Sequence, residues 1–297
     1  MTPTTQFKNL LYLTLLISAG GACATPAQSD DAAAVYEQGI GFQSGKDGEP
    51  DPVAARQAFE KAASQGHARA AVQLGIIHAN ASGVPKDDAR AFEYFSQAAA
   101  AGQREGIYNK GLFLLQGCGA SRDLNAALTS LAAAAEVGSI PAHVKLAELF
   151  YFGAEDLEVD RARALPHVKA AAATGDAWAC NMLGTMAELG YAMPVDRQAA
   201  VRWFSEAARK NNAKAQYNLG RLLHTGKSAR ADAVTSYMWL KLSSLHGETA
   251  AAYILKDHVL AMAPAQISEG DRAVEEFNRN LVRKNAKHEP TPPSGRE

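Results

Sequence analysis

The chain has 297 residues, with 30 Lys and Arg against 31 Asp and Glu, and a formal net charge of −1. This balance gives no strong field to attract nucleic acid or an anionic membrane, and the basic residues are scattered without a stripe. Three cysteines are too few for a disulfide framework in a chain of this length. Abundant Ala with few β-branched runs favours helix.

Residues 1–24 predict a secretory signal peptide, in which Lys8 precedes a short apolar run and Ala22-Cys23-Ala24 supplies the cleavage pattern. The run is too short to span a bilayer permanently. Gly21-Ala22-Cys23 also fits the end of a bacterial lipoprotein signal, although Gly20 stands where Leu is usual. We favour cleavage after Ala24 over a lipid anchor at Cys23. In either case we expect a periplasmic or secreted protein with no membrane span.

The main signal is an internal repeat of about 36 residues. A series of small residues falls at Gly39, Gly75, Gly111, Ala147, Gly184 and Gly220, with spacings of 36, 36, 36, 37 and 36. An acidic series falls at Asp51, Asp87, Asp123, Asp160, Asp196 and Asp232, with spacings of 36, 36, 37, 36 and 36. Both series place one extra residue in the fourth unit. The units are residues 32–67, 68–103, 104–139, 140–176, 177–212 and 213–248.

Each unit is predicted to form two helices. The small-residue series lies in the first helix, where small side chains let neighbouring helices approach closely. The aspartates fall where the second helix begins, and an Asp side chain there accepts hydrogen bonds from free backbone N–H groups. Because the aspartates recur at one structural position, we interpret them as helix caps and not as a metal or acid site. Gly or Asn, at Asn211, ends each second helix.

These units resemble Sel1-like repeats, most closely in Ala215-Gln216-Tyr217-Asn218-Leu219-Gly220 and in the Ala-Ala-x-x-Gly endings. The resemblance covers residues 32–247. It implies an all-α, right-handed α/α superhelical solenoid of about six 36-residue hairpins. Helices over 249–284, including an amphipathic one over about 265–283, are expected to cap the last hairpin. Residues 285–297, which hold three prolines, are expected to be disordered.

The resemblance also implies a non-catalytic scaffold or regulator in the cell envelope, which binds a protein partner in a concave groove without any cofactor. Helical spacing places one set of variable first-helix side chains on a common face. The candidate binding residues are Gln73, Asn109, Lys145, Trp178, Met182, Lys214, Asn218 and Arg221. Trp178 is the best single candidate for a binding hot spot, and packing of Trp178 on the adjoining unit is the competing interpretation.

The sequence also bears on two other functions. A glycan- or peptidoglycan-binding module needs exposed aromatic side chains, and the test is whether Trp178 and Tyr191 are exposed together. Some Sel1 proteins carry a β-lactamase label, but the sequence lacks Ser-x-x-Lys with Ser-Asp-Asn and Lys-Thr-Gly, Gly-x-Ser-x-Gly, His-Glu-x-x-His and a phosphate loop. We therefore expect that the protein is not an enzyme and that it has no metal site. Cys118 and Cys180 are expected to be free thiols.

Overall fold

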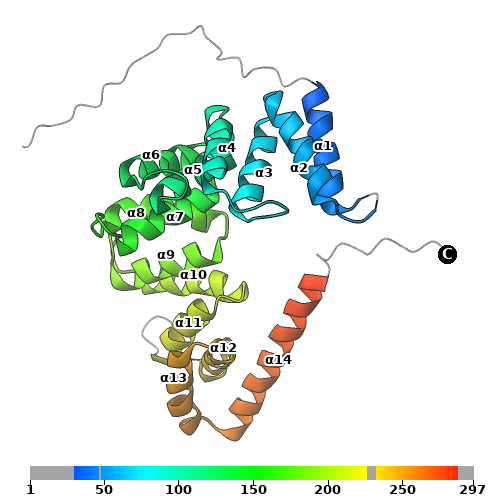
Figure 1. Cartoon of the computed structure of the whole chain (residues 1–297). Helices are drawn as coiled ribbons and strands as arrows, with labels where there is room; N and C mark the ends of the chain where they lie inside the picture. The colour runs from blue at the N-terminus through cyan, green and yellow to red at the C-terminus, as the bar shows by residue number, and fades with distance from the viewer. Residues whose placement is uncertain (1–29, 47, 226–231, 287–297) are drawn as a thin grey trace, which may run out of the picture. The chain divides into compact units, whose positions relative to one another are not determined.

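The computed structural model describes residues 30–46, 48–225 and 232–286, and it divides them into two compact parts at Ala70 and Ala71. The predicted signal peptide and most of the predicted disordered tail lie outside the described residues. Both parts consist of helices, without a strand among the described residues (Figure 1). The predicted all-α solenoid is therefore confirmed.

The N-terminal part holds the first hairpin. It consists of α1 (Asp30–Ser44) and α2 (Pro52–Ser64), and α3 (Ala68–Ala79) begins at its end. Gly39 lies against the ring of Phe59, so a β-carbon on Gly39 would meet ring carbon Cε1 at 2.5 Å. This close approach explains why the first-helix series requires a small residue.

The C-terminal part continues the hairpins from α3 onward, in the order expected from the repeat. Its further helices are α4 (Asp88–Ala100), α5 (Arg104–Gln116), α6 (Leu124–Glu136), α7 (Ile140–Phe152), α8 (Arg161–Ala173), α9 (Ala177–Leu189), α10 (Arg197–Arg209), α11 (Ala213–Thr225), α12 (Ala233–Leu245), α13 (Thr249–Leu260) and α14 (Pro264–Ala286). Consecutive helices pack on one another from α4 to α13. The buried side chains of the middle hairpins form one continuous cluster.

The contact between the two helix series recurs along this part. Gly184 lies against Phe204 of the next helix, and a β-carbon there would stand 2.7 Å from ring carbon Cδ1. The fourth unit has Ala147 in the small-residue series and the smaller Val168 at the position of the phenylalanine, and both are fully buried. The extra methyl group and the smaller partner keep the packed volume nearly constant, as a close-packed core requires.

The predicted caps are confirmed. The side chain of each of the six aspartates accepts a hydrogen bond from a backbone N–H group in the first turn of the helix that follows. Asn211, which replaces glycine at the end of the fifth unit, takes the left-handed conformation with φ of 63°. Asn tolerates this conformation better than other non-glycine residues, so the substitution keeps the turn.

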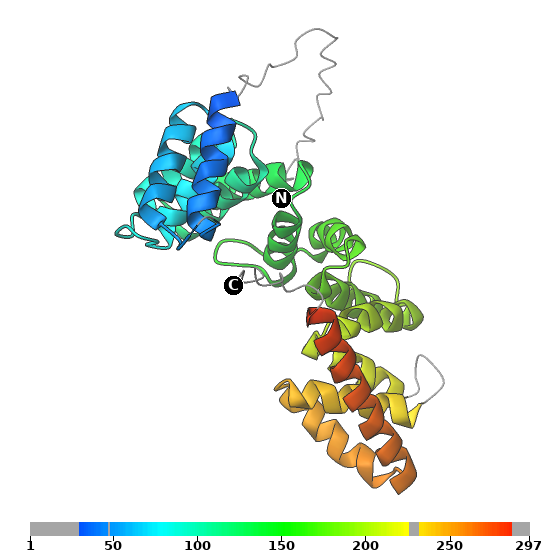
Figure 2. The same ribbon diagram turned by 90° about the vertical axis from the view of Figure 1, so that its right-hand side faces the viewer.

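The last helix, α14, lies alongside α12 (Figure 2). Tyr237 Oη of α12 donates a hydrogen bond to Asp271 at 2.8 Å, and the rings of Trp239 and Phe277 meet edge to face at 5.4 Å. The helix continues through Ala286, two residues into the range expected to be disordered, because no proline interrupts it before Pro290. No helix in the described ranges has the length and apolar character needed to cross a membrane.

Candidate functional site

The predicted binding residues lie on one row of first helices, α5, α7, α9 and α11, with Gln73 on α3. We call this row the first-helix face. Asn218 Nδ2 of α11 donates a hydrogen bond to Asn181 Oδ1 of α9 at 3.0 Å, and both side chains are buried. The hydrogen bond brings neighbouring first helices together. Asn218 therefore joins two units, which limits its availability to a partner.

Arg221 makes the second bridge between α9 and α11. Its Nη2 donates to both carboxylate oxygens of Glu188 at 2.7 Å. The Glu188 side chain is only 11% exposed and that of Arg221 is 30% exposed. A buried carboxylate needs such a partner, because desolvation of an unpaired charge is costly. Arg221 therefore stabilises the stack of units in addition to presenting part of its surface.

Charged and polar groups also occupy the face on α5 and α7. Lys145 Nζ pairs with Glu148 Oε2 at 2.5 Å, and Asn109 Nδ2 donates to the backbone oxygen of Glu105 at 2.9 Å. Burial raises the pKa of Tyr108, and the Lys145 charge opposes this rise. The face in these units is thus polar and internally paired, with Lys145, Asn109 and Gln73 all half-buried.

The remaining candidates differ in accessibility. Met182 is only 6% exposed and belongs to the core, and Trp178 is half-buried against that core. Lys214 is the most open, with a side chain 57% exposed, and it pairs with Glu248 at 3.4 Å. Trp178 and Lys214 occupy equivalent positions on α9 and α11, so they lie at the same end of adjacent helices. They form the accessible part of the predicted face.

A second feature was missed by sequence reasoning. Four large apolar side chains at the turn ends of the fourth and fifth units are exposed by about half or more, and we call this set the apolar edge. They are Phe152 (60%), Val159 (48%), Leu189 (51%) and Val195 (55%). The equivalent residues of the other units are polar, proline or alanine, namely Ser44, Pro50, Asn80, Lys86, Gln116, Arg122, Thr225 and Ala231. The repeat register of the sequence already carries this signal.

An aromatic cluster connects the two turns of the apolar edge. The Arg161 guanidinium lies 5.3 Å from the ring centroid of Tyr151 and 4.3 Å from that of Tyr191. The Tyr151 ring also meets Phe152 edge to face at 4.8 Å. Burial raises the pKa of Tyr151, and the Arg161 charge lowers it. These stacked groups hold the turns of neighbouring units in a fixed arrangement.

The apolar edge is flanked by acidic groups. The side chains of Glu155 and Asp156 are 84% and 72% exposed. Arg122 of the third unit donates to Asp156 Oδ2 at 3.1 Å and to the backbone oxygen of Glu155 at 3.0 Å. Glu158 is exposed as well. The edge therefore combines exposed apolar area with a negative rim.

Trp178 and Tyr191 do not form a sugar-binding platform together. Trp178 lies at the start of α9 and Tyr191 just after its end, a separation of about 20 Å along a helix of this length. Both are half-buried against the core. These two residues therefore do not present the exposed aromatic pair that glycan binding would use.

Two histidine pairs were also missed. His143 Nδ1 and His167 Nδ1 are 3.0 Å apart, and His224 Nδ1 and His258 Nδ1 are 2.8 Å apart. The pKa of His167 is lowered to about 4, first by burial and then by the charges of His143 and Arg163. Burial and the neighbouring His258 also lower the pKa of His224.

Within the described residues, no three His, Cys, Asp or Glu side chains converge in a way that could hold a metal ion. Cys118 is half-buried and Cys180 is buried, and both are free. Burial raises the pKa of the Cys180 thiol, which disfavours the reactive thiolate.

Comparison with known proteins supports the repeat assignment. The family model for the Sel1 repeat matches residues 32–67, 68–103, 140–176, 179–212 and 213–248, more than half of the chain. It does not match residues 104–139, which nevertheless form the same hairpin of α5 and α6. A search among curated proteins found no match.

Among solved structures, a protective antigen of uropathogenic Escherichia coli that displays an SLR fold aligns with a TM-score of 0.74 and 26% identity, over 84% of this chain and 54% of that one. A Sel1 repeat protein from Oxalobacter formigenes aligns with a TM-score of 0.68 and 26% identity, over 76% of this chain and 65% of that one. The chain thus spans between about half and two thirds of these two structures. An immunity protein from Pseudomonas aeruginosa aligns at 22% identity and a TM-score of 0.44 over 78% of this chain and 85% of that one.

Proposed function

Since the chain belongs to the Sel1 repeat family, whose members are generally protein-interaction scaffolds, we propose that it is a non-catalytic scaffold of the cell envelope that binds a protein partner through the apolar edge. The observation that carries this proposal is the exposure of Phe152, Val159, Leu189 and Val195 in two consecutive units. Exposed apolar side chains that cluster and are rimmed by polar groups are typical of interaction sites.

The rigidity of the edge supports binding. Arg161 is stacked between Tyr151 and Tyr191, so the two turns that present the apolar residues are joined before a partner arrives. A preformed surface loses less conformational entropy on association than a mobile one. The partner that fits best carries aliphatic or aromatic side chains, with a basic group to meet Glu158, since Arg122 already pairs with Glu155 and Asp156.

The first-helix face is the alternative contact surface. Its accessible members, Trp178 and Lys214, form the pair that a groove-bound segment would meet first. Asn218 and Arg221 are already engaged with α9, and a partner that used them would have to replace those hydrogen bonds. For this reason we assign the partner to the apolar edge and treat the first-helix face as the competing site.

The location in the cell envelope is part of this proposal, and the sequence of residues 1–24 is its only support. Cell fractionation and mass spectrometry of the mature N-terminus would test it. An N-terminus at Thr25 supports cleavage after Ala24, whereas a diacylglyceryl group on Cys23 supports lipidation. An intact Met1 in the cytoplasmic fraction would contradict export.

Binding is tested by capturing partners from an envelope extract with the purified protein after mild crosslinking, read by mass spectrometry. Two double variants distinguish the surfaces: Phe152→Ser with Leu189→Ser for the apolar edge, and Trp178→Ala with Lys214→Glu for the first-helix face. Leu260→Ser on α13, where the residue is 82% exposed, is the matched control for loss of exposed apolar area.

We expect one reproducible partner, lost with the edge variant and retained with the face variant and the control. Removing two anchors of an interface should weaken the measured affinity by about tenfold or more. Loss with the face variant alone would move the site to the first-helix face. Capture that is equally strong with every variant, or binding to a glycan array without any protein partner, would refute the proposal.

A further inference from the structure

Helices α6, α7 and α8 enclose a hollow of about 260 Å³ between the third and fourth units, which we call the α6–α8 hollow. Leu146 and Phe150 of α7 are its most buried lining residues, at 1% and 4% exposed. The lining also includes Leu128 and Ala132 of α6 and Arg163, Pro166 and His167 of α8. The hollow is therefore apolar at its base and carries its polar groups on α8.

The space corresponds to positions where these two units have small side chains. Seven residues after the capping aspartate, the two following units carry Trp203 and Trp239, whereas the fourth unit carries the smaller His167. Nine residues after the cap, the third unit carries Ala132, and the equivalents in the other units are Glu60, Ser96, Lys169, Ser205 and Lys241. A tryptophan or a longer side chain at either position would occupy the hollow.

Pro166 gives the hollow a rigid apolar wall, although proline is unfavourable inside a helix. It lies in the interior of α8, where it lacks the N–H group that would bond to the carbonyl oxygen of Ala162. The equivalent residues of the other units are Gln57, Glu93, Thr129, Arg202 and Met238. The helix itself gains nothing from this proline, so its place in the wall of the hollow explains it better.

Arg163 supplies a cation without a counter-ion. The equivalent Arg90 of α4 pairs with its capping Asp87 at 3.5 Å, whereas Arg163 forms no ion pair with another described residue. Its guanidinium carbon lies 4.0 Å from the ring centroid of Phe150, and this stacking holds the charge beside the hollow. His167 is neutral at neutral pH, because burial lowers its pKa to about 4. A planar anion is the natural partner of such a guanidinium.

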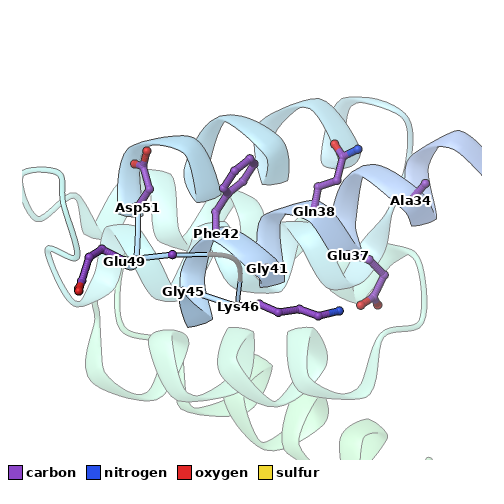
Figure 3. Close-up of a pocket in the computed structure, with 10 residues that line it drawn as sticks. Ala34, Glu37, Gln38, Gly41, Phe42, Gly45, Lys46, Glu49 and Asp51 are labelled. Carbon is purple, nitrogen blue, oxygen red and sulfur yellow. The ribbon is translucent and has the colours of Figure 1, made fainter. Parts of the chain in front are cut away.

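A larger hollow of about 650 Å³ lies on α1 and the turn after it (Figure 3). No described helix precedes α1, so this face is open because the described stack begins there. Its lining places Glu37 and Glu49 in the same hollow as Lys46. This mixture of charges selects no single class of ligand, unlike the one cation of the α6–α8 hollow.

We propose that the α6–α8 hollow binds a small carboxylic acid that has one ring or a short aliphatic chain. The apolar part lies against Leu128, Leu146 and Pro166, and the carboxylate accepts hydrogen bonds from the Arg163 guanidinium. A cavity of about 150 Å³ with apolar walls can hold benzene, so about 260 Å³ gives room for one ring with a substituent. The site shares no residue with the apolar edge, so it can succeed or fail independently of the proposed partner binding.

Ligand-observed NMR titration of the purified protein with benzoate and with hexanoate tests the proposal. We expect each acid to bind with a dissociation constant of about 1 mM or lower, in the range open to ligands of few atoms. Benzamide lacks the charge, benzylamine carries the opposite charge, and inorganic phosphate lacks the apolar part. Each of these three should bind at least about tenfold more weakly than benzoate.

Variants connect binding to the hollow. His167→Trp introduces the side chain of the two following units and should abolish binding of benzoate by filling the space. Arg163→Ala should weaken benzoate by about tenfold and leave benzamide unchanged, so that the preference between them is lost. Arg90→Ala, at the equivalent position of α4, is the matched control and should leave benzoate binding unchanged. Circular dichroism checks folding, and if His167→Trp lowers the helix content, Ala132→Leu fills the hollow from α6 instead.

Four results would overturn the proposal. No binding of benzoate or hexanoate up to about 20 mM means that the hollow does not take such acids. Equal binding of benzamide and benzoate means that Arg163 does not recognise the charge. Equal binding of phosphate means that the apolar walls do not contribute. Benzoate binding that persists in folded His167→Trp and Ala132→Leu proteins places the acid on another surface.

Discussion

Acidification should weaken the fourth unit through His167. This side chain lies half-buried between α7 and α8, with its ring stacked on Phe150 and its Nδ1 3.0 Å from His143 Nδ1. Burial and the charges of His143 and Arg163 lower its pKa from 6.5 to about 4. Burial also lowers the pKa of His143. The folded protein therefore accepts a proton on His167 much less readily than the unfolded chain does.

The direction of the effect follows from this difference. Between about pH 6.5 and pH 4 the unfolded chain binds more protons at this residue than the folded chain, so the free energy of unfolding decreases as the pH falls. The contribution is complete above pH 6.5 and is lost progressively down to about pH 4. For these two pKa values, the loss between pH 7.5 and pH 5 is about 2 kcal/mol.

The prediction is tested with His167→Gln, which keeps a hydrogen-bonding group but cannot titrate. Urea unfolding followed by circular dichroism is compared at pH 7.5 and pH 5 for both proteins. Hydrogen exchange of α7 and α8 supplies a local readout, because repeat proteins can unfold in segments. The variant should lose about 2 kcal/mol less than the wild type on acidification. An equal loss in both proteins would refute the assignment of the effect to His167.

Three further substitutions test the packing and the caps, each by the change in urea unfolding. Gly184→Ala should destabilise the protein by about 1–3 kcal/mol, because the methyl group would stand 2.7 Å from the Phe204 ring, and a neutral result would contradict the close approach. Asp196→Ala should lower the free energy of unfolding by about 1 kcal/mol, because the hydrogen bond from Ala199 N is lost. Asp196→Asn should retain most of that stability. Arg221→Ala should lower the free energy of unfolding by about 3 kcal/mol, because Glu188 is left buried without its partner. The same substitution should have a smaller effect in a protein that already carries Glu188→Gln.

The fold could be predicted from the sequence because the same few contacts are repeated. Small residues such as Gly184 and bulky ones such as Phe204 recur at fixed spacing, and the five pairs whose small residue is glycine are in contact in the structure. The capping aspartates mark the start of every second helix, and all six accept the expected hydrogen bond. Local signals and tertiary packing agree in every unit, which is the condition for a reliable inference of structure from sequence.

The candidate site could be predicted only in part. Helical spacing placed Trp178, Lys214 and Arg221 on first helices, but it could not show that Arg221 is bound by Glu188 of the preceding first helix. That ion pair depends on the rotation between units and on rotamers. The histidine pairs depend on the same kind of information, since His143 and His167 come from two helices of one hairpin and meet only when it closes.

The apolar edge has a property that explains where functional information lies in a repeat protein. Positions that build the core must be similar in every unit, so they identify the family without distinguishing its members. A residue that differs in chemical type from its equivalents in the other units indicates a requirement that is specific to its own unit. Phe152 and Leu189 are apolar where other units have Ser, Asn, Gln or Thr. Each departure increases the apolar area exposed to water, which is unfavourable unless another molecule covers it.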